Sequence, residues 1–287
     1  MRDIVARDPG LFGFNRSRWT LDLIRSACPW LGDVTRSGVH GLLERLDIIR
    51  KRGQAHVHSP DRLYMEKRAD IARICAQSGA SSGEIVLIYQ DEVTIYRQPT
   101  ISSAYGARGS DQPLAERSHA ANTQTRYVAG LERTRGQVIF RRSAHTTVKE
   151  LVKFHQDIRA AYPHARVIYV VLDNWPVHFH PDLLVALQAQ ERQHLFKTPP
   201  NWPTEPSTKA KEAWGNLELP LQLVPLPTYA SWLNPIEKLW RWMNQEIVQH
   251  HRLAHDLASF RQKVDDFLRQ FAGPSPELLH YVGLPLP

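Results

Sequence analysis

The pattern of apolar residues changes near residue 83, from helical periodicity before it to short strand-like runs after it. Residues 18–31 place Leu, Ile and Cys side chains at helical spacing, and residues 37–49 do the same with Val and Leu. Ser37 or Thr35 can cap the second of these helices. The first part of the chain is therefore predicted to be helical, with two short amphipathic helices close together.

Two short helices joined by a tight turn, with a basic run after the second, are typical of a helix-turn-helix. In that motif the second helix enters the major groove of DNA, and residues near its start face the base edges. The residues that we expect to contact DNA are Thr35, Arg36, Ser37, His40, Arg50, Lys51 and Arg52. A helical hairpin with a solvated basic face is the alternative interpretation of the same pattern.

A third helix is expected from Ser59-Pro60, a cap followed by a first-position proline, to about Ala76. The small, polar residues 77–84 (QSGASSGE) then indicate a linker. These features predict a helix-turn-helix region at 1–58, a helical linker at 59–82 and a second domain at 83–287.

The second domain alternates strands and helices. Short apolar or β-branched runs predict strands at 84–90, 126–131, 137–143, 166–172 and 221–226. Helical patterns lie at 146–161, where Thr146 can cap, and at 181–192, 235–250 and 254–271. This order predicts an α/β fold, a mixed sheet with flanking helices that follows a small all-α domain.

Charge and cysteine content narrow the class of protein. The 287 residues carry a net charge of +7, and the first 82 hold 14 Lys and Arg against 9 Asp and Glu. The excess therefore lies on the helical region and suits an anionic partner. The only cysteines, Cys28 and Cys75, exclude a disulfide-stapled scaffold and a cysteine-rich zinc module. No apolar run approaches the ~20 residues of a membrane helix.

Three acids stand at the boundaries of predicted elements. Asp91 follows the strand at 84–90, Asp173 follows the strand at 166–172, and Glu237 lies near the start of the helix that opens at Asn234-Pro235. Carboxylates that converge at one sheet edge suit Mg²⁺ or Mn²⁺. Two such ions about 4 Å apart can catalyse phosphoryl transfer.

Each acid also fits a structural role when it is taken singly. Asp91 and Asp173 could end strands in turns, and Glu237 could be the partner of an Asn234 cap. Glu92 should point to the opposite face of its strand from Asp91, so it is left out of the group.

The sequences around the three acids resemble one family pattern. YQDE, VLDNWPVH and LPTYASWLNPIEKLW are similar to the catalytic segments of IS630-type transposases, in the IS630/Tc1/mariner group of DDE enzymes. The resemblance implies a ribonuclease-H-like fold at 83–287 and a DDE triad of Asp91, Asp173 and Glu237 that binds two Mg²⁺ or Mn²⁺ ions. Asn174, His178 and Asn234 are expected beside that triad.

The same resemblance implies a function. It implies cleavage of double-stranded DNA at transposon ends and strand transfer into target DNA at TA sites, by a homodimer when two ends are paired. A bacterial, cytoplasmic, nucleoid-associated protein with no membrane segment is expected. The alternatives are a catalytically inactive or truncated DNA-binding relative and a general ribonuclease-H-like nuclease that cuts RNA–DNA hybrids.

The chain departs from the family pattern in two places. Between Asp173 and Glu237 lie 63 residues, more than the family usually has, and the excess falls in the Pro-rich segment 191–219. This insertion could bind DNA through Lys197, Lys209 and Lys211, or it could be neutral, which we favour. Family members usually carry about one more helix-turn-helix module ahead of residue 1, so the N-terminus is expected to be either truncated or misassigned.

Other residues are assigned structural roles. His178 and His180 could form a metal site with Asp173, but we favour His178 as a neighbour of the acids that contacts phosphate or orients Asp173. Trp232, Trp240 and Trp242 are interpreted as core or helix-packing residues.

Overall fold

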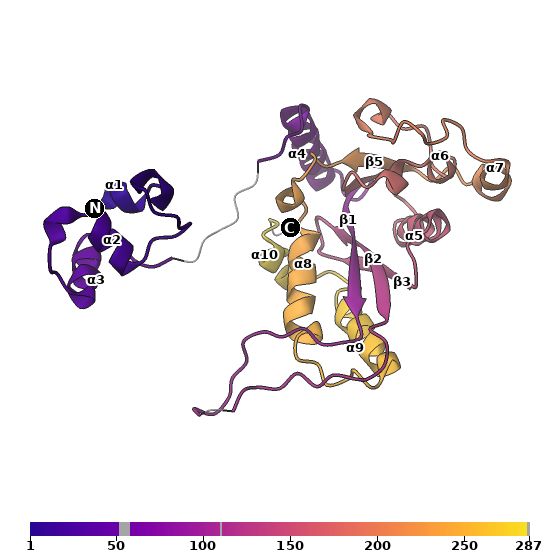
Figure 1. Ribbon diagram of the computed structural model, residues 1–287. Coiled ribbons are helices and arrows are strands. Elements are labelled where there is room, and N and C mark those ends of the chain that lie inside the picture. The colour runs from indigo at the N-terminus through magenta and orange to yellow at the C-terminus, as the bar shows by residue number, and fades with distance from the viewer. Residues whose placement is uncertain (52–57, 110, 286–287) are drawn as a thin grey trace. The chain divides into compact units, whose positions relative to one another are not determined.

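The computed structural model describes residues 1–51, 58–109 and 111–285, and the chain divides into two compact units, Met1–His56 and Val57–Pro287 (Figure 1). Each unit has its own hydrophobic core. The first unit is all helical, whereas the second is built around one mixed sheet.

The first unit contains the two predicted helices, α2 at Leu21–Ala27 and α3 at Arg36–Arg45, and a short helix α1 at Arg2–Val5. Both main helices are shorter than predicted. Helix α2 ends before Pro29, because proline lacks an N–H group and disfavours helical geometry in the residue before it, and 29–31 form a 3₁₀ turn. The core residues of the unit are Ile24, Cys28, Leu31, Val39 and Leu43.

Helix α4 spans Tyr64–Ala80, so it starts later and ends later than predicted. Ser59 does not cap it, because the helix begins five residues later; the Ser59 hydroxyl donates to the carbonyl oxygen of Thr228 at 2.6 Å and accepts from the N–H of Asp61. The helix packs on strand β1 within the second unit. Residues 59–82, which we expected to link two domains, are therefore part of the second unit.

The second unit is organised by a five-stranded sheet of order β3-β2-β1-β4-β5. The central strand β1 is antiparallel to β2 and parallel to β4, and β4 is parallel to β5. The strands are β1 at Ile85–Tyr96, β2 at Gln124–Glu132, β3 at Val138–Ser143, β4 at Val167–Leu172 and β5 at Leu221–Pro225. All five predicted strands are confirmed, although β1 is longer than expected.

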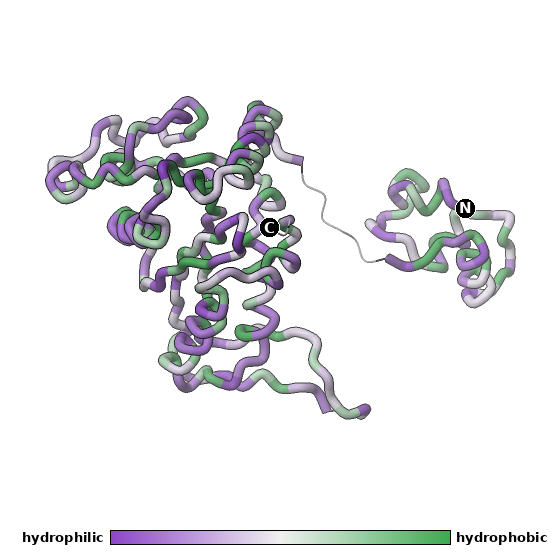
Figure 2. Tube along the Cα trace, turned by 180° about the vertical axis from the view of Figure 1, so that it is seen from behind, coloured by the Kyte–Doolittle hydropathy of each residue, from purple (hydrophilic) through white to green (hydrophobic). Residues whose placement is uncertain are grey.

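Alternate residues of the strands enter two different cores. In β1, Leu87 and Tyr89 face one core, and Val86 and Ile88 face the other. Helices α4, α8 (Ile236–Met243), α9 (Leu257–Arg269) and α10 (Pro276–Val282) cover the first face, and α5 (Val148–Ala161) and α6 (Pro181–Leu184) cover the second. Figure 2 shows hydrophobic and hydrophilic stretches on the same helical coils, as expected for helices with one buried side.

Three helix predictions for the second unit need correction. Helix α5 is capped by Thr147, whose side chain accepts from the N–H of Glu150, and not by Thr146. Helix α6 stops at Leu184, because the chain then turns to run beside the sheet, where Gln188 N–H bonds to Leu219 O. Helix α8 gives way to a π-helical turn at Asn244–Val248 instead of continuing to His250.

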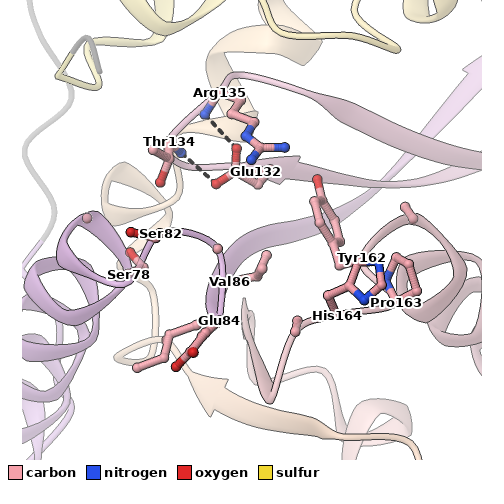
Figure 3. Close-up of a pocket in the computed structure, with 15 residues that line it drawn as sticks. Ser78, Ser82, Glu84, Val86, Glu132, Thr134, Arg135, Tyr162, Pro163 and His164 are labelled. Carbon is pink, nitrogen blue, oxygen red and sulfur yellow. Dashed lines mark hydrogen bonds between the residues drawn. The ribbon is translucent and has the colours of Figure 1, made fainter.

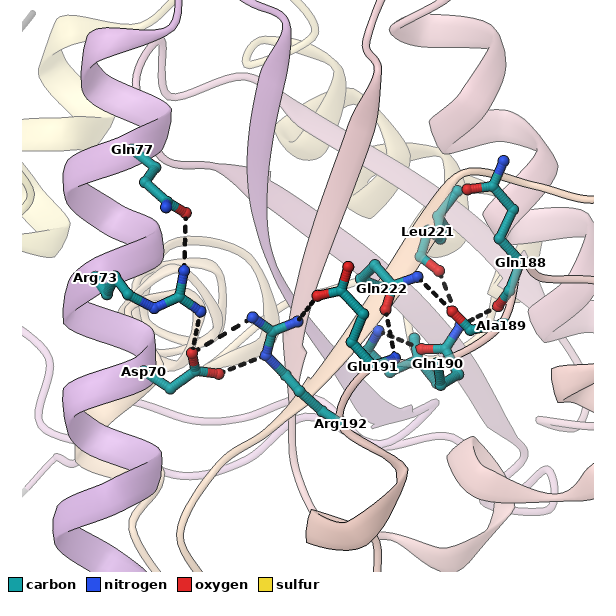
Figure 4. A network of polar contacts seen from close by, with 11 residues as sticks. Asp70, Arg73, Gln77, Gln188, Ala189, Gln190, Glu191, Arg192, Leu221 and Gln222 are labelled. Atoms are coloured by element: carbon teal, nitrogen blue, oxygen red, sulfur yellow. Dashed lines mark hydrogen bonds and ion pairs between the residues drawn. The ribbon is translucent and has the colours of Figure 1, made fainter.

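The inserted segment 191–219 lies at the β5 edge of the sheet, with a helix α7 at Thr208–Trp214 (Figure 1). The side-chain amide of Gln190 donates to Leu221 O at 3.0 Å and accepts from Leu223 N–H at 2.8 Å. In return, Gln222 donates to Ala189 O and accepts from Glu191 N–H (Figure 4). Gln190 thus satisfies backbone groups of β5 that an uncovered edge strand would expose, and Gln222 holds the covering segment against the strand.

An ion pair then joins the insertion to α4. Arg192 is buried and contacts Asp70 of α4 with a shortest distance of 2.5 Å (Figure 4). Its guanidinium group also lies over the ring of Tyr169. Two of the lysines that could have bound DNA also have partners within the unit. Lys197 donates to Thr228 Oγ1 at 2.9 Å, and Lys211 lies 3.6 Å from Glu205.

We expect Lys67→Met to destabilise the second unit by about 3–5 kcal/mol, the usual effect of breaking a buried ion pair. The ammonium group of Lys67 lies 3.0 Å from Asp61 Oδ2, and these side chains are 0% and 2% exposed. The substitution therefore leaves the buried carboxylate with only the more distant, half-exposed ammonium group of Lys197, 3.9 Å from Asp61 Oδ2. Chemical denaturation measures the loss, and Arg68→Met, on the exposed side of α4, should change stability by less than ~0.5 kcal/mol.

The pH dependence provides an internal check on the same pair. Burial alone would raise the pKa of Asp61, but hydrogen bonds from the Thr228 and Leu63 N–H groups and from Lys67 outweigh it and hold the pKa well below its usual range. The ionised Asp61 carboxylate therefore contributes its full stabilisation above the unfolded-state pKa of about 4. This stabilisation is lost as the pH falls from there through the lower folded-state pKa. A Lys67→Met effect that stays constant into strong acid would contradict this account.

Gln190→Ala should destabilise the β5 edge by about 1–3 kcal/mol, because it leaves the buried N–H of Leu223 without its acceptor. Hydrogen exchange of the Leu223 amide should accelerate accordingly, while the matched variant Gln188→Ala, at an exposed position, leaves it unchanged. Equal exchange in both variants would mean that Gln190 does not protect the edge.

Candidate active site

The sequence predicted that Asp91 directly follows a strand. In the structure Asp91 instead lies within strand β1. Pairing with β2 continues through Asp91, opposite Ala129, to Tyr96. Pairing with the parallel strand β4 stops earlier, at Tyr89 opposite Val171. The same register, continued by two residues, brings Asp91 level with Asp173, which follows the last residue of β4.

Helix α8 is held against β1 by two side chains on either side of Glu237. Asn234, just before the helix, donates to the carbonyl oxygen of Gln90 at 3.1 Å. Trp240 donates from Nε1 to Asp91 Oδ2 at 3.0 Å. Because Asn234, Glu237 and Trp240 are spaced by three residues, they lie along one side of the helix. The side chain of Asn234 therefore positions the helix on the sheet and does not cap it.

The carboxylates influence one another strongly. Burial, reinforced by the charges of Glu237 and Glu92, raises the pKa of Asp91 to about 8. Burial and the charge of Asp173 likewise raise the pKa of Glu237, while Arg241 opposes the shift. The structure thus places Asp91 on β1, Asp173 directly after β4 and Glu237 on α8 near one another. The charge of Glu237 disfavours ionisation of Asp91, and the charge of Asp173 disfavours ionisation of Glu237.

Asp173 differs from the other two acids because of His178. Nε2 of His178 lies 3.3 Å from Asp173 Oδ1 and 3.4 Å from Glu92 Oε2. Burial alone raises the pKa of Asp173, but the contact with His178 outweighs it and lowers that pKa. Burial would lower the pKa of His178, yet the charges of Glu92 and Asp173 raise it to about 10. His178 is 1% exposed, so it can contact Asp173 but not a phosphate in solvent.

Asn174 and His180 point to other partners. Asn174 accepts from Lys67 at 3.3 Å and donates to Leu226 O at 2.5 Å, which joins the end of β4 to the residues after β5. His180 accepts from the N–H of Asp182 and packs against Trp202. Neither residue contacts the three acids through these bonds.

The three acids have the donor chemistry of a divalent-cation site. In the part of the chain that the structure describes, no three His, Cys, Asp or Glu side chains are drawn together closely enough to hold a metal ion. Burial is the first cause of the raised pKa values of Asp91 and Glu237, and the charges of neighbouring carboxylates, which a cation would offset, are the second. Oxygen donors of this kind fit Mg²⁺ or Mn²⁺.

A groove of about 800 Å³ opens beside Glu237, between the end of β1 and α8. Trp232, Tyr96 and Arg241 also line it. Trp232 is 52% exposed, so its interpretation as a packing residue is wrong. The reason is local: it lies in the 3₁₀ turn Ser231–Leu233, before the buried face of α8 begins. Trp240 and Trp242 are packed as predicted, in the core and against Phe267 and Tyr281.

The predicted DNA-contacting residues of the first unit have mixed surroundings. Thr35 caps α3 through its hydroxyl, and Arg36 forms an ion pair with Asp22. Ser37 is exposed, and His40 is exposed with Glu44 3.6 Å away. The basic residues Arg50 and Lys51 are exposed, whereas Arg52 lies outside the described residues.

A separate cavity of about 440 Å³ lies at the other end of β1, around residues 84–86, Tyr162 and Glu132 (Figure 3). The carboxylate of Glu132 accepts from the N–H groups of Thr134 and Arg135, so its charge serves the β2–β3 turn. Because residues at the start of β1 line this cavity, it is separate from the acidic site near the other end of the strand.

Two contacts beside the acids were not predicted from the sequence. The indole donor of Trp240 was hidden because tryptophan at helical spacing normally indicates packing. The contact between Glu92 and His178 was not predicted, because it joins strand β1 to the turn that follows strand β4. Its only signal was that an acid occupies a central strand at all, where charges are rare unless paired.

Among the described residues, no helix has both the length and the apolar character needed to cross a membrane.

Residues 86–261 match the family model described as DDE superfamily endonuclease. A relative from Shigella sonnei, "Insertion element IS630 uncharacterized 39 kDa protein", is 23% identical over 255 residues, which cover 88% of this chain. The chain spans 64% of the length of that relative.

Two solved structures are similar in fold. A mariner Mos1 paired-end complex with Mg has a TM-score of 0.58 at 14% identity, covering 95% of this chain and 73% of that one. A Mos1 transposase paired-end complex with the left transposon end has a TM-score of 0.56 at 16% identity, covering 91% and 69%. The mixed sheet with flanking helices is thus the ribonuclease-H-like fold that the sequence predicted, and the chain belongs to the DDE superfamily endonuclease family.

Proposed function

We propose that the protein is a DNA transposase that cuts double-stranded DNA at the ends of an insertion element and joins those ends to target DNA. The observation that supports this most is geometric: the register of β1 and β4 sets Asp91 level with Asp173, and Trp240 of the helix that carries Glu237 donates to Asp91, within a DDE-family fold. We assign these three residues as the catalytic acids. TA dinucleotides are the proposed target.

The three carboxylates would hold divalent cations, Mg²⁺ or Mn²⁺, and we propose two ions. When bound, such ions lower the pKa of an attacking hydroxyl and stabilise the leaving oxygen of a phosphodiester. The protein supplies the geometry. Trp240 fixes one oxygen of Asp91, and Asn234 fixes the start of the helix that carries Glu237.

The groove beside Glu237 suits a DNA strand. Exposed Trp232 and Tyr96 offer aromatic faces to bases, and Arg241 offers a cation to the backbone. Water first hydrolyses a phosphodiester at the element end and leaves a 3′-hydroxyl. That hydroxyl then attacks a target phosphodiester, so one bond forms as another breaks and no external energy source is needed.

The first unit would bind the DNA of the element ends. The exposed side chains of Ser37 and His40 on α3 are placed to read bases, and Arg50 and Lys51 to contact phosphates. The Mos1 relatives are described as paired-end complexes, so we propose that two copies of this chain pair two ends. The proposed setting is the bacterial nucleoid, where the DNA lies.

The variants Asp91→Asn and Asp173→Asn should lower cleavage of element-end DNA in Mg²⁺ by about 10³-fold or more, because each removes a charged donor that supports the transition state. Binding of the same DNA should stay nearly unchanged. Gel-based cleavage and binding assays measure both quantities. Asp157→Asn, which alters a surface pair with Arg141, is the control. Cleavage by Asp173→Asn at the wild-type rate would show that the triad is wrongly assigned.

Arg50→Ala and Lys51→Ala should each weaken DNA binding for all sequences alike. Each should also reduce the slope of log affinity against log salt concentration by about one, since each removes one phosphate contact. Fluorescence anisotropy at several salt concentrations measures the slope. His40→Ala should instead reduce the preference for end DNA over unrelated DNA. An unchanged slope in both basic variants would exclude Arg50 and Lys51 from the interface.

A further inference from the structure

A series of polar side chains leads from helix α5 across strand β1 to the acidic site. His155 on α5 contacts Gln90 on β1 at 3.1 Å, and Gln90 donates to Glu92 Oε1 at 3.1 Å. The other oxygen of Glu92 lies 3.4 Å from Nε2 of His178, and the same nitrogen lies 3.3 Å from Asp173 Oδ1. Four groups on three elements therefore lead to one oxygen of one of the three acids.

The four polar side chains of this series are buried, which is energetically costly unless they have a role. His155 and Gln90 are fully buried, and the side chains of His178 and Glu92 are 1% and 11% exposed. Removing a polar group from water costs free energy that apolar residues of similar volume would not cost. The side chain of Asp173, in contrast, is 55% exposed. The series of polar side chains therefore leads from the interior to a carboxylate that solvent and ligands can reach.

The two oxygens of Asp173 are used differently. Oδ1 accepts from the N–H of Trp175 at 2.9 Å and is the atom that faces His178. The imidazole of His178 also packs edge-on against Trp175, with ring centroids 5.5 Å apart. The backbone hydrogen bond from Trp175 and the charge contact with Nε2 of His178, which makes no hydrogen bond by its geometry, thus both act on Oδ1. Groups behind a metal-binding carboxylate commonly orient it in this way.

We propose that Glu92 and His178 are positioning residues for Asp173: Glu92 holds the imidazole of His178 from the opposite face of β1, and His178 fixes Oδ1 of Asp173 so that the carboxylate is oriented toward the bound cation. This inference rests on the proposed function, because it assigns these residues a task at the same site. Glu92 is not itself a ligand, since strand alternation directs it away from Asp91 toward α5.

The test measures binding of Mn²⁺ directly, by the electron paramagnetic resonance signal of the free ion, on the full chain without DNA. Glu92→Gln and His178→Leu should each raise the dissociation constant of Mn²⁺ by about 10- to 100-fold. His178→Gln, which keeps a donor at a similar reach, should recover part of the affinity. The control is His180→Ala, a neighbouring histidine that contacts Asp182 and Trp202 and should leave Mn²⁺ affinity unchanged.

Cleavage provides the second measurement. In Glu92→Gln the Mn²⁺ concentration for half-maximal cleavage should rise, while the rate at saturating Mn²⁺ falls much less. In the double variant Glu92→Gln with His178→Leu, the effect should be no larger than in His178→Leu alone, because Glu92 acts through His178. Glu92→Gln is nearly isosteric and can keep its contact with Gln90, so it tests the proposal even where His178→Leu does not fold.

The possible results separate this inference from the proposed function. If Asp91→Asn and Asp173→Asn abolish cleavage but Glu92→Gln and a folded His178→Leu bind Mn²⁺ as the wild type does, the positioning role is refuted and the triad stands. If Glu92→Gln is as inactive as Asp91→Asn at every Mn²⁺ concentration, Glu92 is a ligand and the proposal is also wrong. If the triad variants themselves cleave normally, the proposed function fails first.

Discussion

The contact between helix α8 and strand β1 is the constraint on which the site depends. Glu237 is far from the other two acids in sequence and is carried by a helix, which could slide or rotate on the sheet. Two hydrogen bonds prevent this, from Asn234 to the backbone of Gln90 and from Trp240 to Asp91. The apolar side of the helix, with Ile236, supplies the burial that makes these directional bonds effective. Helix α8, which carries Glu237, thus also orients Asp91 through the indole of Trp240.

The strand register contributes the second constraint. Parallel pairing of β1 with β4 sets Asp91 level with Asp173, and the antiparallel pairing with β2 keeps β1 extended after β4 has ended. A central strand that outlasts its neighbour leaves a step at the sheet edge. Acids on that step can face solvent, although the residues just before them, such as Tyr89 and Val171, are buried.

Much of this arrangement was predictable from the sequence, for reasons that differ by residue. The strands were predictable because β-branched runs such as 166–172 have no good helical alternative. The start of α4 was not, because the carboxylate of Asp61 accepts from the N–H groups of Leu63 and of Thr228, a residue remote in sequence, and holds a turn before the helix begins. The acids could be chosen because three motifs agreed. The roles of Trp240 and Glu92 could not, because they depend on which side chain lies across the sheet.

The insertion at 191–219 shows how the interval between two of the acids can vary without changing the site. The chain leaves the end of β4, covers the outer edge of the sheet through Gln190 and Gln222, and returns as β5, which pairs directly with β4. The added residues lie to one side of the line along which the acids are brought together. The number of residues between the second and third acids is therefore a property of the sheet edge and not of the chemistry. A motif search that fixes this interval would pass over chains whose catalytic elements are intact.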